Sequence, residues 1–190
     1  KKSTVLTREK VLEKIPTLEP KDLKGGVIYY DGQFDDARLA VTLAQTAEDL
    51  GACVLNYVQV RGLIKTGGLV AGVQVVDKIS GKEHEVMART VVNATGIFVD
   101  SVLKMDAPDH ENIISPSQGV HIVLDQSFLP GDTAILVPHT EDGRVLFAVP
   151  WHGRVIVGTT DTPIAQPSLE PLPLKEELSF LLDHAAKYLT

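Results

Sequence analysis

Thr90-Val91-Val92-Asn93-Ala94-Thr95-Gly96 is the stretch around which this sequence is organised. Its first three residues are β-branched, which is the composition of a strand buried on both faces of a sheet. Small and polar residues follow at once, and Gly96 has no Cβ to obstruct a close approach. In open α/β sheets ligands bind at the carboxyl ends of strands. The stretch predicts a central parallel strand that ends against a ligand, with an ordinary strand and loop as the alternative.

The residues before this stretch predict helices and strands in alternation. A short helix over Thr7–Ile15 ends at Pro16, which cannot continue it. After a short strand over Gly26–Tyr30, a second helix begins at Asp35 or Asp36 and runs to Leu50, where Gly51 stops it. The apolar run Cys53–Leu55 then predicts a strand, with Cys53 as a small core residue.

From Tyr57 onwards apolar residues alternate with polar ones, which is typical of half-buried strands. Turn signals at Thr66-Gly67-Gly68 and Ser80-Gly81-Lys82 divide this region into three strands. We therefore expect an antiparallel meander inserted before the strand at Val91.

Beyond Gly96 the pattern predicts a helix over Phe98–Met105, four strands and a last helix. Turn signals of Gly and Pro separate the four strands at the spacing of an antiparallel sheet. The four strands and the helix start are Gly119–Leu124, Thr133–Val137, Arg144–Pro150, Arg154–Gly158 and Leu174.

These elements predict two domains with a boundary near residue 105. The fold class is α/β plus α+β: residues 1–105 form an α/β part with an inserted meander, and residues 106–190 form an antiparallel sheet with a helix. A net charge of −7 argues against a nucleic-acid surface. No apolar run has membrane-spanning length, and the single cysteine excludes an internal disulfide.

His121 is the first candidate for chemistry, because it interrupts an apolar strand two residues after Gly119. One reading is a core histidine whose ring nitrogens bind backbone carbonyls. The other is a proton acceptor in a cleft over the sheet.

Arg144 is the second candidate, because it opens an apolar strand directly after the turn Asp142-Gly143. Its guanidinium can present a bidentate fork to a phosphate or carboxylate, but the pattern alone favours a surface arginine paired with Glu141 or Asp142. Thr159–Pro163 supplies hydroxyls and an acid at a strand end, which suits a ligand site or a turn. The sequence contains no GxGxxG, GxSxG or Walker motif, and its histidines have no metal-ligand spacing.

Taken together and in order, six segments resemble the FAD-dependent (respiratory) glycerol-3-phosphate dehydrogenases and their oxidase relatives. The resemblance covers essentially Gly25 to Thr190. The segments are 25–39, 51–52 with 55–57, 92–96, 117–121, 142–144 with 150–151, and 158–163.

The resemblance implies oxidation of sn-glycerol 3-phosphate to dihydroxyacetone phosphate, with hydride transfer to FAD and electrons passed to a membrane quinone. By the same resemblance, Val58 meets the adenine, and Asn93, Ala94, Thr95 and Gly96 line the flavin. His121 lies near the substrate hydroxyl, and Arg144 holds the substrate near the flavin. The two predicted parts become part of a doubly wound FAD/NAD(P)-binding domain, 1–105, and part of a substrate domain, 106–190.

The family's GxGxxG unit is missing from the sequence, so the resemblance also implies that the 190 residues are the middle of a longer enzyme. We expect that enzyme to be cytoplasmic and peripheral at the inner face of the cell membrane. We expect the 190-residue piece to fold without binding FAD, to be inactive, and to self-associate through an exposed sheet edge or rebuild that edge locally.

Two rival functions remain open on the sequence alone. A flavin-dependent amino-acid or amine oxidase of the same architecture would take a carboxylate substrate. A binding module would have no catalytic activity at all.

Overall fold

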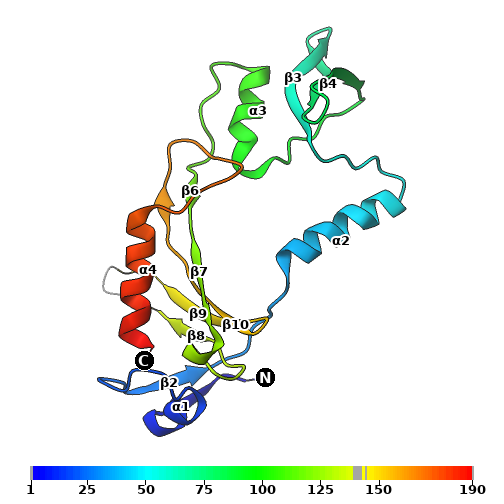
Figure 1. Cartoon of the computed structure of the whole chain (residues 1–190). Coiled ribbons are helices and arrows are strands. Elements are labelled where there is room, and N and C mark those ends of the chain that lie inside the picture. The colour runs from blue at the N-terminus through cyan, green and yellow to red at the C-terminus, as the bar shows by residue number, and fades with distance from the viewer. Residues whose placement is uncertain (1, 139–142, 144, 190) are drawn as a thin grey trace. The chain divides into compact units, whose positions relative to one another are not determined.

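A computed structural model describes residues 2–138, 143 and 145–189 (Figure 1). The chain divides into two compact units. The first contains residues 1–31 and 115–190, and the second contains residues 32–114. Each unit is described here by itself.

The first unit is built on a four-stranded antiparallel sheet. Its strands are β7 (His121–Asp125), β8 (Ile135–Val137), β9 (Leu146–Trp151) and β10 (Arg154–Gly158), in the order β7-β10-β9-β8. Each of them falls within or close to a strand predicted from the spacing of turn signals, so the antiparallel sheet is confirmed.

Helix α4 (Lys175–Tyr188) lies along this sheet in Figure 1 and closes its core. Alternate residues of β9 and β10 point towards the helix, which is why their burial follows the period of two that a strand imposes. The buried apolar side chains of the cluster are Ile15, Leu129, Leu146, Ala148, Val155, Val157, Leu181, Ala185 and Leu189.

Short elements complete the first unit. Strands β1 (Thr4–Thr7) and β2 (Gly25–Ile28) form an antiparallel pair around helix α1 (Arg8–Lys14). Strand β6 (Ser117–Gln118) pairs with β11 (Thr162–Pro163), and the 3₁₀ turn η2 covers Gln126–Phe128. The first helix begins as predicted, because the Thr7 side chain accepts a hydrogen bond from the N–H of Lys10.

The second unit contains the predicted meander. Strands β3 (Val58–Thr66), β4 (Leu69–Asp77) and β5 (Glu83–Met87) pair antiparallel in chain order. The 3₁₀ turn η1 (Gly96–Phe98) leads into helix α3 (Val99–Asp106). Lys65 joins β3 to α3, because its Nζ lies 2.9 Å from both the backbone oxygen and Oδ1 of Asp106.

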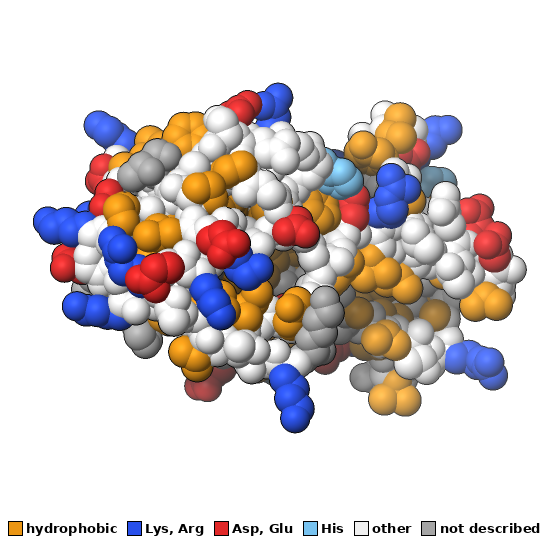
Figure 2. All heavy atoms as spheres, turned by 90° about the horizontal axis from the view of Figure 1, so that it is seen from below, with side chains coloured by type: hydrophobic (Ala, Val, Ile, Leu, Met, Phe, Trp, Pro, Cys, Tyr) orange, Lys and Arg blue, Asp and Glu red, His pale blue; other side chains and the backbone are white. Residues whose placement is uncertain are grey.

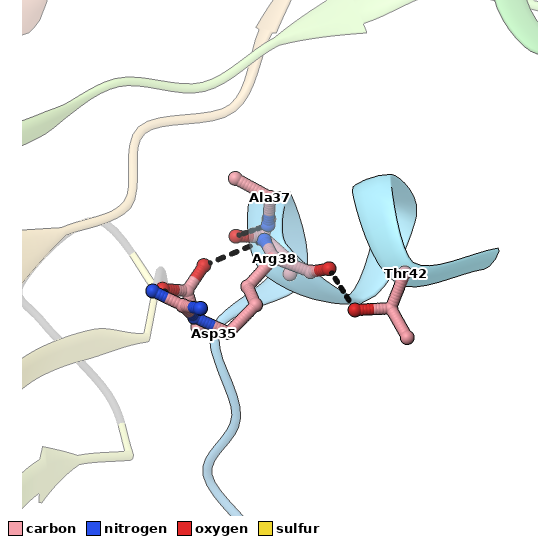
Figure 3. Close-up of polar contacts among 5 residues, drawn as sticks. Asp35, Ala37, Arg38 and Thr42 are labelled. Atoms are coloured by element: carbon pink, nitrogen blue, oxygen red, sulfur yellow. Dashed lines mark hydrogen bonds and ion pairs between the residues drawn. The ribbon is translucent and has the colours of Figure 1, made fainter. Parts of the chain in front are cut away.

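Helix α2 (Asp36–Asp49) also belongs to the second unit, and it starts where the sequence predicts. The carboxylate of Asp35 accepts from the N–H of Arg38 at 2.9 Å, and this cap satisfies one of the open donors of the first turn (Figure 3). Arg38 also lies 3.9 Å from Asp35, as an exposed ion pair that contributes little to stability.

Two predicted strands are wrong. Neither Val91–Val92 nor Cys53–Leu55 is a strand in the structure, and Cys53 is exposed rather than buried in a core. Val92 is 79% exposed and Leu55 is 67% exposed. The β-branched composition favours an extended backbone, but a strand also needs a neighbour that exchanges hydrogen bonds with it. No described strand pairs with either segment, and every described strand pair is antiparallel.

The surface carries charges of both signs. Figure 2 shows one face, on which acidic, basic and hydrophobic side chains are interspersed. Among the described residues, no helix is both long enough and apolar enough to cross a bilayer.

Candidate functional site

In the first unit the structure brings together two segments that the sequence analysis singled out separately. In β7 and β10, His121 stands opposite Gly158. Before His121 in the chain, Gln118 of β6 pairs with Thr162 of β11, which follows Gly158. The segments 117–121 and 158–163 therefore run antiparallel, side by side, although about forty residues separate them in the sequence.

His121 projects from the face of the sheet opposite the core. Its neighbour Ile122 packs against the core cluster, whereas His121 itself is exposed. The interpretation as a core histidine is therefore wrong. On the other side of β10, Phe147 of β9 stands opposite Gly158, and its side chain is also exposed on this face.

Gly158 makes room for the imidazole of His121. A Cβ built on Gly158 would overlap the His121 ring and would lie 2.9 Å from the backbone oxygen of Val120. A glycine is required here because the ring lies directly over the backbone of β10. The ring is therefore held on one side by the sheet and remains accessible on the other.

Sequence reasoning missed Glu177, a carboxylate in the first turn of α4 that is only 2% exposed. Its Oε2 accepts from the N–H of Leu174 at 2.8 Å and from Nε2 of Gln118 at 2.9 Å. Its Oε1 accepts from the hydroxyl of Thr160, also buried, at 3.3 Å. A glutamate three residues after a helix cap is a recognisable signal, but its partners 17 and 59 residues away are not.

Opposing effects act on the pKa of Glu177. Burial raises the pKa, but hydrogen bonds from the N–H of Leu174 and from the side chains of Thr162, Gln118 and Thr160 lower it, and together they hold it below the ordinary value of 4.5. The carboxylate is therefore charged in the folded protein at neutral pH.

This pKa predicts a pH-dependent contribution to stability. A group whose pKa is lowered on folding stabilises the protein above its unfolded pKa, and this contribution is lost as the pH falls through the folded pKa. We expect Glu177→Gln to reduce the free energy of unfolding by about 2 kcal/mol at neutral pH, the size of a lost charged hydrogen bond. The difference between the two proteins should shrink below pH 4.5.

Urea unfolding of both proteins at neutral and acidic pH measures this difference. The carboxylates of Glu9, Asp77 and Asp125, whose pKa values are also lowered, are present in both proteins and cancel. A difference that stays constant with pH would contradict the assignment.

In the second unit, Asn93 organises the segment expected to line a cofactor. Its Oδ1 accepts from the hydroxyl of Thr95 at 2.8 Å and from its N–H at 3.4 Å. Its Nδ2 donates to the backbone oxygen of Val99 at 3.1 Å. The side chain of Asn93 thus fixes the turn through which the chain enters η1 and α3.

The Ala94–Gly96 backbone is open to a ligand. These residues are exposed, and within the described part of the chain no group accepts a hydrogen bond from the N–H of Ala94 or Gly96. Gly96 has a φ of +56°, and a Cβ added there would meet nothing within 4 Å. Open donors beside an uncovered glycine fit the close approach of a diphosphate or ribitol group.

The remaining predicted residues are placed as follows. Val58 begins β3, opposite Asp77, and is half-buried. Val58 and Asn93–Gly96 belong to the second unit, and His121 belongs to the first. Arg144 lies outside the described residues.

Comparison with known proteins assigns the chain to a family. The model of the FAD dependent oxidoreductases matches residues 1–190. The chain belongs to the FAD-dependent oxidoreductase family. The cofactor of this family is FAD.

Within this family the curated relatives are named glycerol-3-phosphate dehydrogenase, mitochondrial. The Schizosaccharomyces pombe protein is 41% identical over 98% of this chain, and the Homo sapiens protein is 42% identical over 100%. The chain spans 30% and 27% of their lengths, respectively. The resemblance noted in the sequence is confirmed.

Solved structures agree with this family assignment. The Bacillus halodurans glycerol-3-phosphate dehydrogenase, crystallised with FAD, is 35% identical with a TM-score of 0.91. It covers 97% of this chain, which spans 37% of that enzyme. A glycine oxidase from Bacillus cereus, at 22% identity and a TM-score of 0.73 over 98% of this chain and 48% of its own, shares the fold. The predicted fold class is thus confirmed at the level of a mixed α/β flavoprotein with antiparallel sheets.

Proposed function

We propose that the complete protein carrying this chain oxidises sn-glycerol 3-phosphate to dihydroxyacetone phosphate. The observation that carries the proposal is the likeness of 97% of the chain to a glycerol-3-phosphate dehydrogenase crystallised with FAD, at 35% identity and a TM-score of 0.91. FAD, when bound, accepts the hydride that leaves the substrate carbon.

Residues of this chain bind the substrate and the cofactor and accept the substrate proton. The exposed His121 takes the proton of the substrate hydroxyl as the hydride leaves, because an imidazole is a proton acceptor near neutral pH. The guanidinium of Arg144 binds the substrate phosphate through paired hydrogen bonds. The N–H groups of Ala94 and Gly96 donate to the cofactor, and Val58 meets its adenine.

The domain roles follow from this assignment. Residues 1–105 contribute to the FAD-binding domain of a doubly wound fold, and residues 106–190 contribute to the substrate-binding domain. The supporting observation is that Asn93–Gly96 and His121 fall in these two parts of the sequence and in different compact units. The two divisions differ at the N-terminus, because residues 1–31 group with residues 115–190 in one compact unit.

Flavin absorbance tests the proposed reaction. The complete protein, purified with its flavin, should lose the absorbance of oxidised flavin when sn-glycerol 3-phosphate is added without oxygen. Glycine and other amino acids should leave the absorbance unchanged. Bleaching by glycine instead would favour an amino-acid oxidase, a second candidate that the shared fold of the glycine oxidases supports.

Replacement of Arg144 by lysine should weaken catalysis while keeping the positive charge. A lysine cannot form the bidentate fork, so we expect kcat/KM to fall by the equivalent of roughly 2–3 kcal/mol. Steady-state kinetics of the complete protein with Arg154→Lys as control measures this, because Arg154 forms an exposed ion pair with Asp125 at 3.0 Å. Equal kinetics for both variants would identify Arg144 as a surface residue.

Four further properties remain predictions. They are a quinone as electron acceptor, peripheral attachment to the inner face of the cell membrane, a cytoplasmic location, and self-association of the 190-residue piece. A reduced flavin must pass two electrons to an acceptor, and either a membrane quinone or oxygen balances the reaction. Reoxidation of the reduced flavin by a soluble quinone analogue, compared with reoxidation by oxygen, distinguishes the two acceptors.

A further inference from the structure

Two residues that belong to no strand directly precede His121. Gly119 and Val120 lie between β6 and β7, so no ladder of backbone hydrogen bonds holds them. Gly119 is packed tightly: a Cβ added there would lie 2.5 Å from Oγ1 of Thr159 and 2.6 Å from the backbone oxygen of Thr160. His121 follows this break and begins β7 opposite Gly158, so the break and the strand pairing together set its position.

A chain of hydrogen bonds leads from this break to Glu177. The N–H of Val120 donates to Oγ1 of Thr160 at 3.0 Å, and the hydroxyl of Thr160 donates to Oε1 of Glu177 at 3.3 Å. On the other side of the break, Nε2 of Gln118 donates to Oε2 of Glu177 at 2.9 Å. One carboxylate therefore holds both ends of the segment that precedes His121.

We propose that Glu177 is a positioning residue for His121, acting through Thr160 and Gln118. This inference rests on the proposed function, in which His121 takes the substrate proton. Glu177 itself does not touch the substrate.

This role requires a charged carboxylate at position 177 rather than a neutral amide. A carboxylate only accepts hydrogen bonds, so the single proton of the Thr160 hydroxyl must point to it, and the hydroxyl oxygen is left to accept from Val120. A glutamine has no orientation that keeps this pattern. With its NH₂ group at Oε1 it would reverse the Thr160 hydroxyl. With its NH₂ group at Oε2 it would oppose two donors, the N–H of Leu174 and Nε2 of Gln118.

Three substitutions in the complete protein test the proposal through the rate of flavin reduction. Glu177→Gln and Thr160→Val each break the chain of hydrogen bonds. We expect both to lower the rate constant at saturating sn-glycerol 3-phosphate by about 10- to 100-fold, the cost of a small misplacement of a catalytic group. The concentration for half-saturation should change much less, because Arg144, the proposed phosphate ligand, is unchanged in these variants. Thr160→Ser keeps the hydroxyl and should recover the rate to within about threefold of wild type.

Leu181→Ala is the matched control. Leu181 lies one turn after Glu177 on α4 and is fully buried. Its replacement should destabilise the protein by leaving a cavity rather than by removing a hydrogen bond. Its reduction rate should stay within about twofold of wild type at a temperature where the variant is folded.

Two results overturn the inference, and they are distinguishable from each other. If the wild-type flavin is not reduced by sn-glycerol 3-phosphate, the proposed function fails and the inference fails with it. If the wild type is reduced and Thr160→Val matches Thr160→Ser, the function stands and the positioning role is wrong. The Thr160 pair decides the matter even if Glu177→Gln does not fold.

Discussion

Replacement of His121 by asparagine in the complete protein is expected to slow flavin reduction by sn-glycerol 3-phosphate by about 100-fold or more, the size of a general-base contribution. An asparagine side chain can accept a hydrogen bond, but it is not basic enough to remove a proton. Because His121 is exposed on its sheet face, its loss should leave the free energy of unfolding within about 0.5 kcal/mol of wild type. Flavin content should also be unchanged.

Stopped-flow absorbance under anaerobic conditions measures the reduction rate, and urea unfolding measures stability. The matched control is His152→Asn, the same substitution at an exposed histidine in the turn between β9 and β10 of the same unit. It should reduce at the wild-type rate. A His121 variant that keeps its reduction rate and loses only stability would show that the histidine has a structural role.

Replacement of Gly96 by valine is expected to abolish FAD retention in the complete protein. Two effects act at this position. The φ of +56° is strained for a β-branched residue, and the added side chain would occupy the open space beside the donors of Ala94 and Gly96. The meander β3-β4-β5 does not include Gly96 and should keep its structure.

Gly81→Val separates the two effects. Gly81 lies in the turn between β4 and β5 of the same unit, has a φ of +73°, and also has nothing within 4 Å of an added Cβ. It therefore carries the same kind of backbone strain without facing the expected cofactor. Flavin absorbance per protein, after gel filtration, should be lost in Gly96→Val and retained in Gly81→Val. Equal flavin content in the two variants would mean that Asn93–Gly96 is an ordinary loop.

Local patterns in the sequence were sufficient where a residue's conformation depends on its near neighbours. Thr7 and Asp35 begin helices because their side chains accept from N–H groups three residues further along. The meander and the four-stranded sheet follow from period-two alternation divided by glycine turns. His121 and Gly158 were both noted in the sequence, but only their register in β7 and β10 shows that the ring lies over the glycine.

The absence of the strand predicted at Val91–Val92 shows the limit of this reasoning. A β-branched run specifies an extended backbone, but hydrogen-bonding partners come from elsewhere in the tertiary structure. The same limit explains why the roles of Val58, Arg144 and Asn93–Gly96 rested on family resemblance rather than on spacing.

The sequence by itself determined the family, the antiparallel sheets, the helix caps and the candidate His121. Each of these follows from local composition or from motifs that occur in the same order as in the family. Only the tertiary structure decided that His121 is exposed and that segments 117–121 and 158–163 lie side by side. It also decided that Glu177 is buried and accepts hydrogen bonds from a residue of each segment. The physical reason is that a buried carboxylate is tolerated only where several donors converge on it. Those donors come from residues up to 59 positions away, which no local pattern specifies.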